Sequence, residues 1–268
     1  MVNQPHSPTG EFRPNKYQTR QRVREDELGE VVRAIQTDTG SEVALLQLRR
    51  QFYRAPVETM QRLRMAAAEA KTLNHPSVVQ VVDFQLDHRG GDLFIAMTFI
   101  DGETLRTWLA SRSAGVSLST AAKIVADLAD AFHHIGENGR RWVHPVVNPD
   151  KIIITQKQIG RTDHPVMVDL GFVHLFSIYG GIASEPTTRD QEDVHALGVL
   201  FFDLLSGGFP SDYGKADLRF AEQRQVEQGI NELTLRLHIA PSTLWTTLRR
   251  ALAVDPTQRF ASPAEFGR

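Results

Sequence analysis

The sequence predicts an α+β fold in two parts, a small, mainly antiparallel β part with one helix and a larger, mainly α-helical part. Up to about residue 100, short aliphatic runs alternate with turn-forming residues. Beyond that point, apolar residues recur at helical spacing. We therefore expect a flexible N-terminal lead-in at 1–20, a β-rich lobe at 21–100 and a helical lobe at 101–268, together forming a piece of a longer protein.

The composition excludes several classes of function. Thirty Lys and Arg balance 32 Asp and Glu, so no basic excess points to nucleic acid or a membrane surface. The absence of cysteine excludes disulfides and thiolate chemistry. No apolar run approaches the roughly 20 residues that span a bilayer, and the first residues lack the apolar core of a signal peptide. We expect a cytoplasmic domain without nucleic-acid or membrane contact.

In the first part, strands alternate with clusters of turn residues. Strands are expected at 28–34, 42–48, 78–84 and 92–97. The first two form a hairpin around the turn residues at 37–40. Between the second and third strands, residues 57–73 are rich in Ala, Arg and Met, which favour a helix. Asn74-His75-Pro76 ends it, because proline disfavours helical geometry in the preceding residue.

In the second part, helical spacing dominates. Helices are expected at 104–109, 119–135, 194–205 and 243–254. The helix at 119–135 carries its apolar residues on one side, which predicts packing of that side against a core. The helix at 194–205 is apolar nearly all round, which indicates that it is buried.

Several ordered stretches resemble motifs of the protein kinase-like superfamily, in particular bacterial Ser/Thr (Hanks-type) kinases. Val43-Ala44-Leu45-Leu46 resembles V-A-x-K, and residues 73–79 resemble the L-x-H-P-x-I-V turn. Residues 97–105 resemble the hinge, with Met97 as gatekeeper. Residues 193–200 and 251–260 resemble the D-x-x-x-L-G helix and the closing D-P-x-x-R motif. The resemblance covers about residues 23 to 266 and implies a bilobal kinase-like fold.

The same resemblance identifies residues 143–154 as the counterpart of the catalytic loop H-R-D-x-K-P-x-N. Its histidine and proline remain as His144 and Pro149. The position of the catalytic base is Val146, which cannot accept a proton. The lysine position is Asn148, and the metal-binding asparagine position is Lys151. The resemblance thus implies a catalytic loop that has lost its usual chemistry.

The nucleotide-binding positions differ from the family pattern as well. The lysine that contacts phosphates corresponds to Leu46, and its glutamate partner to Ala66. Glu69, one turn later, is either that partner after a shift of the alignment or a solvated helix residue. Only the last glycine of the G-x-G-x-x-G loop remains, at Gly29. Residues 25–27 form an acidic tip that we expect to repel a triphosphate.

Asp169 is the one metal-binding position that keeps its family residue. It begins Asp169-Leu170-Gly171, a variant of D-F-G, and could hold Mg²⁺. In the family fold, the positions of Asp169 and Lys151 converge. We therefore expect the Lys151 ammonium to pair with Asp169 and replace the metal, so that the domain holds neither metal nor cofactor.

Residues that support the fold are retained. By analogy with the family, Val31, Ala44, Met97 and Ile153 line the cleft between the lobes. His144 and Leu170 would belong to a second apolar column, which Asp193 anchors. Arg259 is expected to pair with Glu185 at the end of the activation segment.

Other residue patterns favour structural roles over functional ones. His133 and His134 are adjacent and point to different faces of one helix, which disfavours a metal site. Hydroxyl residues between 177 and 188 could be phosphorylated, although turn chemistry alone accounts for them. The three tryptophans are expected to serve in packing. They are Trp108, Trp142 and Trp245.

Retained packing with altered chemistry is the pattern of a pseudokinase. The sequence therefore predicts a chain that is not an enzyme, binds ATP weakly or not at all, and acts as a scaffold or allosteric regulator. Its partner would be a protein, such as an active kinase or a signalling regulator. Two alternatives remain open: a divergent kinase-fold transferase that uses nucleotide, with Asp169 and a non-standard base, and a cleft that holds another small ligand.

Overall fold

The computed structural model describes residues 16–25, 28–86, 93–137, 147–155, 163–172, 189–208, 220, 222–237 and 242–268. The chain forms two compact units. The small unit comprises Met1–Thr72 and Gln80–Phe99, and the large unit comprises Leu73–Val79 and Ile100–Arg268. The chain therefore leaves the small unit after Thr72, returns at Gln80 and leaves again after Phe99.

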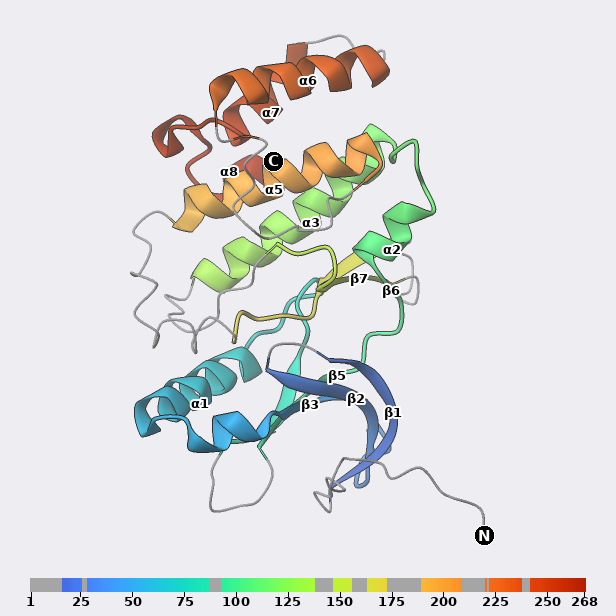
Figure 1. Ribbon diagram of the computed structural model, residues 1–268, viewed down its shortest axis with the longest axis vertical. Coiled ribbons are helices and arrows are strands. Elements are labelled where there is room, and N and C mark those ends of the chain that lie inside the picture. Colours follow the sequence, from blue (N-terminus) through green and yellow to red (C-terminus); the bar gives the residue numbers. More distant parts are fainter. Residues whose placement is uncertain are drawn as a thin grey trace. The chain divides into compact units, whose positions relative to one another are not determined.

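The small unit contains a five-stranded antiparallel sheet with strand order β1-β2-β3-β5-β4 (Figure 1). Its strands are β1 (Tyr17–Glu25), β2 (Gly29–Gln36), β3 (Glu42–Leu48), β4 (Val81–Gln85) and β5 (Phe94–Thr98). The 3₁₀ helix η1 (Arg50–Arg54) leads into helix α1 (Val57–Lys71), which packs against β4. The predicted α+β class is confirmed: the N-terminal unit is rich in β-strands and contains helix α1.

Alternation along the strands divides the apolar residues of this sheet between its two faces. One face carries a buried cluster of Tyr17, Val32, Ala34, Val43, Leu45, Phe94 and Ala96. The other face carries Val31, Leu46, Ala44 and Met97, because Val31 is opposite Leu46 and Ala44 is opposite Met97 in the register. Three residues predicted to line a cleft, Val31, Ala44 and Met97, thus share one face of the sheet with Leu46.

A polar contact joins the two edges of this sheet. Although β1 and β4 are its first and last strands, the Tyr17 hydroxyl donates to Asp83 Oδ2 at 3.0 Å. Lys16 Nζ reaches the same oxygen at 2.8 Å. Burial acts to raise the pKa of the Asp83 carboxyl, but the hydrogen bonds from Lys16 and Tyr17 outweigh it, so the pKa is lowered. The sheet therefore curls until its edges meet.

Two predicted boundaries differ from the structure. Strand β1 begins at Tyr17, inside the range 1–20 expected to be a flexible lead-in, because the Tyr17 ring is buried and packs edge-on against Phe94. The strand predicted at 78–84 begins only at Val81, because Val78 pairs with Met167 instead. Residues 73–79, placed in the β-rich lobe by the sequence, therefore belong to the large unit.

The large unit combines a three-stranded sheet with several helices. Its strands are β6 (Glu103–Thr104), β7 (Ile152–Thr155) and β8 (His164–Met167), in the order β6-β7-β8. Its helices are α2 (Leu105–Ala110), α3 (Leu118–Glu137), α5 (Arg189–Ser206), α6 (Gln223–Leu237), α7 (Ser242–Ala251), the 3₁₀ helix η5 (Pro256–Gln258) and α8 (Pro263–Gly267).

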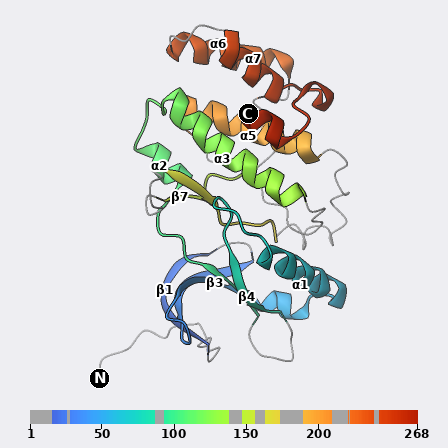
Figure 2. The ribbon, with the colours of Figure 1, turned by 180° about the vertical axis from the view of Figure 1, so that it is seen from behind.

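Helix α3 is central to this unit. It contacts α5, α8 and β8. Its neighbour α5 contacts α6 and α7 in turn (Figure 2). Ile124, Leu128 and Phe132 of α3 are buried, as their spacing predicted. Helix α6 was not predicted, although Val226, Ile230 and Leu233 recur at helical spacing and are buried.

We expect Asp83→Asn to destabilise the small unit by about 1 kcal/mol at pH 7, because it removes a charged acceptor from Tyr17 and Lys16. Since folding lowers the pKa of Asp83, its contribution is present above the ordinary carboxyl pKa of about 4 and is lost as the pH falls through the lower, folded pKa. Urea unfolding between pH 7 and pH 3 measures this. A difference between the two proteins that does not shrink toward pH 3 would contradict the assignment.

Candidate functional site

Asp169 lies two residues beyond β8, and both of its carboxylate oxygens have partners. Oδ1 accepts a hydrogen bond from the Gly171 N–H at 2.8 Å, in a turn where Gly171 adopts a φ of 76° that favours glycine. Oδ2 lies 3.8 Å from Lys151 Nζ. The two side chains are 28% and 19% exposed, so the pair is accessible from solvent but partly desolvated. The structure thus brings together the two residues that the sequence singled out.

A tight turn places Lys151 beside Asp169. The Lys151 N–H donates to the Asn148 carbonyl at 2.8 Å, and Asn148 Oδ1 accepts from the Asp150 N–H at 2.9 Å. The Val168 N–H then donates to the Lys151 carbonyl at 2.9 Å, which ties the two loops together. Asn148, at the family's lysine position, therefore has a structural use: its side chain caps this turn.

Helix α2 fixes the same turn from outside. Arg106 Nε donates to both carboxylate oxygens of Asp150, at 2.8 and 3.0 Å. The Arg106 N–H also donates to the Pro149 carbonyl at 3.2 Å. The position of the Lys151 main chain is therefore set by contacts that do not involve Asp169.

The Lys151–Asp169 pair defines what this site can do chemically. Two unit charges about 4 Å apart attract by several kcal/mol near a protein surface, before the cost of desolvation. A divalent cation at Asp169 would have to compete with that ammonium. A lysine ammonium is also a strong phosphate-binding point charge. Among the described residues, no group of three or more His, Asp and Glu side chains could hold a metal ion.

In the small unit, the phosphate-binding positions are apolar and buried. Leu46 is 4% exposed and Ala66 is fully buried, so neither offers a charge. Gly29 has a structural reason to be glycine, because a Cβ there would lie 1.8 Å from the Gln47 carbonyl oxygen on β3. The close approach of β2 and β3 thus accounts for Gly29 without a bound phosphate.

The expected acidic tip is partly neutralised. Glu25 forms ion pairs with Arg22 and, at 3.0 Å, with Arg49. Repulsion of a triphosphate by Glu25 is therefore weaker than the sequence suggested, because two guanidinium groups offset its charge. Asp26 and Glu27 lie outside the described residues.

Glu69 differs from the solvated helix residue expected for it. Its side chain is half-buried in α1, and Oε1 is buried with no hydrogen-bond partner in the described part of the chain. Ala66, one turn earlier, is fully buried. A carboxylate oxygen removed from water in this way costs free energy, so this position is more constrained than a surface glutamate.

The residues expected to support the fold are only partly described. His144, Val146 and Glu185 lie outside the described residues. Asp193 is half-buried in α5, and Leu170 is buried. Ile153 pairs with Val166 within the sheet of the large unit.

Arg259 binds main-chain carbonyls in the described part of the chain. It donates to Ala253 at 2.7 Å, to Gln191 at 3.0 Å and to Val254 at 3.3 Å, which joins the C-terminal segment to α5. Burial lowers the pKa of Arg259, although Glu192 and Asp255 oppose the effect. The pairing with Glu185 stays a prediction.

The tryptophans follow their predicted packing role in part. Trp108 is 1% exposed, and its indole N–H donates to Asp163 at 3.2 Å. Trp245 is only partly buried, under the Arg249 guanidinium at 4.7 Å from the ring centroid. Trp142 and the hydroxyl residues between 177 and 188 lie outside the described residues.

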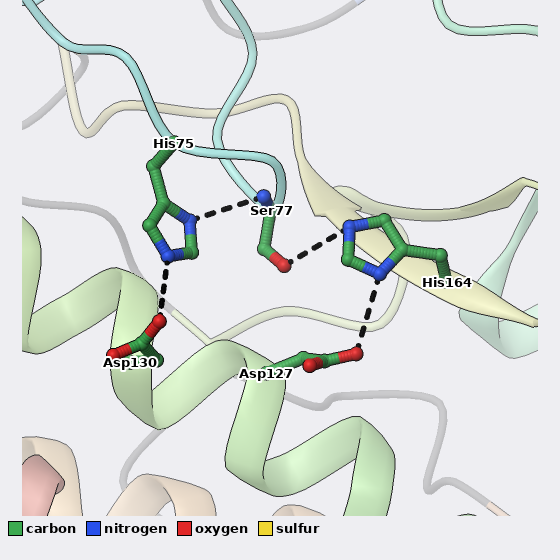
Figure 3. Close-up of polar contacts among 5 residues, drawn as sticks. All are labelled: His75, Ser77, Asp127, Asp130 and His164. Atoms are coloured by element: carbon green, nitrogen blue, oxygen red, sulfur yellow. Dashed lines mark hydrogen bonds and ion pairs between the residues drawn. The ribbon is translucent and has the colours of Figure 1, made fainter. Parts of the chain in front are cut away.

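One polar cluster was not predicted at all (Figure 3). His75 contacts Ser77 and Asp130 of α3. His164 of β8 contacts Ser77 and Asp127 of α3. Ser77 and His164 are fully buried. No local pattern marks this cluster, because Ser77 and His164 are 87 positions apart in the sequence.

The arrangement of elements matches that of solved kinase domains. The Mycobacterium tuberculosis PknI kinase domain is similar with a TM-score of 0.65 at 23% sequence identity, over 94% of this chain and 93% of that one. The fold is therefore that of a protein kinase domain.

Sequence comparison assigns the family. Residues 17–170, more than half of the chain, match the family model for protein tyrosine and serine/threonine kinases, and the chain belongs to this family. Serine/threonine-protein kinase pkn3 of Myxococcus xanthus is 25% identical over 273 residues, covering 94% of this chain and 48% of that protein. PrkC of Bacillus subtilis is 25% identical over 220 residues, covering 78% and 33%. The chain thus spans about half the length of these relatives or less.

These relatives correct one expectation. They are named serine/threonine-protein kinases, which points to an enzyme, so the prediction that the chain is not an enzyme is wrong. That prediction assumed that losing charges at Leu46 and Ala66 removes function, although Lys151 supplies a cation elsewhere, beside Asp169.

In the described ranges, no helix has the length and apolar character needed to cross a membrane.

We expect Leu46→Lys to destabilise the small unit by about 2–4 kcal/mol, because it buries an ammonium where Ala66 offers no partner. Leu46→Met, a change of similar volume, should cost less than about 1.5 kcal/mol. Adding Ala66→Glu to Leu46→Lys should recover part of the loss. Urea unfolding of the four proteins measures this, and a Leu46→Lys protein as stable as the parent would show that position 46 reaches water.

Proposed function

We propose that this domain is a divergent nucleotide-dependent transferase of the Ser/Thr kinase family, in which Lys151 takes the place of a metal ion beside Asp169. The observation that carries the proposal is the Lys151–Asp169 pair, 3.8 Å apart and accessible from solvent. The names of the relatives support an enzyme of this class.

The physical basis is charge neutralisation. Phosphoryl transfer depends mainly on positioning and on positive charge near the transferring group. The Lys151 ammonium offers such a charge, and Asp169 with the turn at Asn148 orients it. Since position 146 is a valine, the base would be another group. Weak nucleotide binding is expected, because Leu46 contributes no charge to the phosphates.

We expect ATP to raise the melting temperature of the chain to the same extent with and without Mg²⁺, because Lys151 occupies the neighbourhood of Asp169. Lys151→Met should lower ATP affinity about tenfold by removing the phosphate-binding charge. Lys151→Asn places the family's metal-binding residue there and should make ATP binding depend on Mg²⁺. Thermal shift and calorimetric titration measure these effects.

Lys123→Met, which removes an exposed lysine of α3, serves as the matched control and should leave ATP affinity unchanged. The decisive contrary result is a magnesium-dependent thermal shift of the parent chain that Asp169→Asn abolishes. Such a shift would show that Asp169 binds a metal despite Lys151.

A second candidate is a regulatory module that works by binding a protein. It is favoured by the buried, apolar character of Leu46 and Ala66, which leaves the family's lysine and glutamate positions without charge. Transfer of phosphate from radiolabelled ATP to the chain or to a generic basic protein distinguishes the candidates. Transfer that Asp169→Asn abolishes supports the transferase. No transfer, together with a bound partner retained by Asp169→Asn, supports regulation by protein binding.

A further inference from the structure

The segment Leu73–Val79 belongs to the large unit and is held there by side-chain hydrogen bonds (Figure 3). Main-chain hydrogen bonds hold it as well. Its Ser77 Oγ lies 3.3 Å from His164 Nε2, and His164 Nδ1 lies 3.2 Å from Asp127 Oδ2. These three side chains form a continuous chain from α3 through β8 to the segment.

The direction of the two hydrogen bonds among Ser77, His164 and Asp127 follows from the carboxylate of Asp127. An ionised Asp127 only accepts, so the His164 Nδ1–H donates to it. In the neutral imidazole, Nε2 is then the acceptor for the Ser77 hydroxyl. Serine, histidine and aspartate in this order resemble the constellation of a hydrolase, but Ser77 and His164 are fully buried. No substrate reaches Ser77, so a nucleophilic role is excluded.

These hydrogen bonds hold strand β8, which precedes Asp169. His164 begins β8, and Met167 ends it, two residues before Asp169. The Met167 N–H donates to the Ser77 carbonyl at 2.9 Å, and the Val79 N–H donates to the Met167 carbonyl at 2.9 Å. Ser77 therefore contacts both ends of β8, through its side chain at His164 and through its main chain at Met167.

We propose that Asp127 and His164 are positioning residues for Asp169, an inference that rests on the proposed function of the Lys151–Asp169 pair. By fixing β8 against α3 and against Ser77, they set the distance between the Asp169 carboxylate and Lys151 Nζ. A strand free to shift along its axis would alter that distance, and with it the phosphate-binding charge.

Helix α3 supplies a matched control in Asp130, one turn from Asp127. Asp130 Oδ2 lies 3.0 Å from His75 Nε2, and His75 Nδ1 accepts from the Ser77 N–H at 3.1 Å. Asp130 is thus an acidic residue bonded to a histidine of the same cluster, but its side chain is 74% exposed, and the contact drawn for it in Figure 3 is to His75.

The test compares Asp127→Asn with Asp130→Asn in the full chain, using ¹³C-labelled aspartate and calorimetric titration with ATP. The Asp169 carboxyl resonance is assigned by its loss in Asp169→Asn. We expect Asp127→Asn to move that resonance and to weaken ATP binding at least threefold, while Asp130→Asn does neither. Ser77→Ala should act like Asp127→Asn, and Ser77→Thr, which keeps a hydroxyl, should restore the parent behaviour.

The outcomes separate this inference from the proposed function. If Asp127→Asn and Ser77→Ala lower the melting temperature but leave the Asp169 resonance unmoved, the cluster only stabilises the fold and the inference is overturned. If the resonance moves while Lys151→Met leaves ATP affinity unchanged, the positioning role stands and the proposed function fails. If the Asp127→Asn protein does not fold, the comparison of Ser77→Ala with Ser77→Thr decides whether the positioning role stands.

Discussion

Two main-chain hydrogen bonds around Met167 are the constraint on which the rest of the large unit's site depends. They join Met167 to Ser77 and Val79, while Val168 bonds to Lys151 on the other side. The strand before Asp169 is therefore held from both sides, and the Asp169 carboxylate lies within reach of the Lys151 ammonium. Main-chain bonds of this kind do not depend on the identity of the side chains, so Asn148 and Lys151 can occupy this loop without loss of these bonds.

The sequence predicted most elements because their causes are local. The strand at 42–48 and the helix beginning at 57 agree with the structure in position, since alternation and helix propensity are properties of neighbouring residues. The errors lie where distant residues decide. Val78 looked like part of a strand of the small unit, but its partner Met167 lies 89 positions away (167 − 78) and draws it into the other unit.

The candidate site could likewise be predicted only where its residues belong to a sequence motif. Asp169 and Lys151 could be found from spacing, because a family motif fixes both positions, and the structure places them together. Arg22 lies only three positions from Glu25 on β1, and this neighbour was missed. The ion pair of Glu25 with Arg49 could not be found, because it joins residues 24 positions apart (49 − 25). The contacts of His164 with Ser77 and Asp127 could not be predicted either, because these residues share no motif. Long-range polar pairing leaves no periodic signal, so substitutions at motif positions are a poor guide to the net charge of a site.

The discontinuity of the small unit has a consequence for how the chain assembles. Strand β5 lies between β3 and β4 in the sheet, although it is the last of the five to leave the ribosome. One edge of β3 therefore stays unpaired until Thr98 has been synthesised. The segment that carries Ser77 waits longer, because Asp127, His164 and Met167 follow it by some 50 to 90 positions. The small unit can therefore complete its sheet once Phe99 has been synthesised, whereas the segment that carries Ser77 gains its partners only as the rest of the large unit follows.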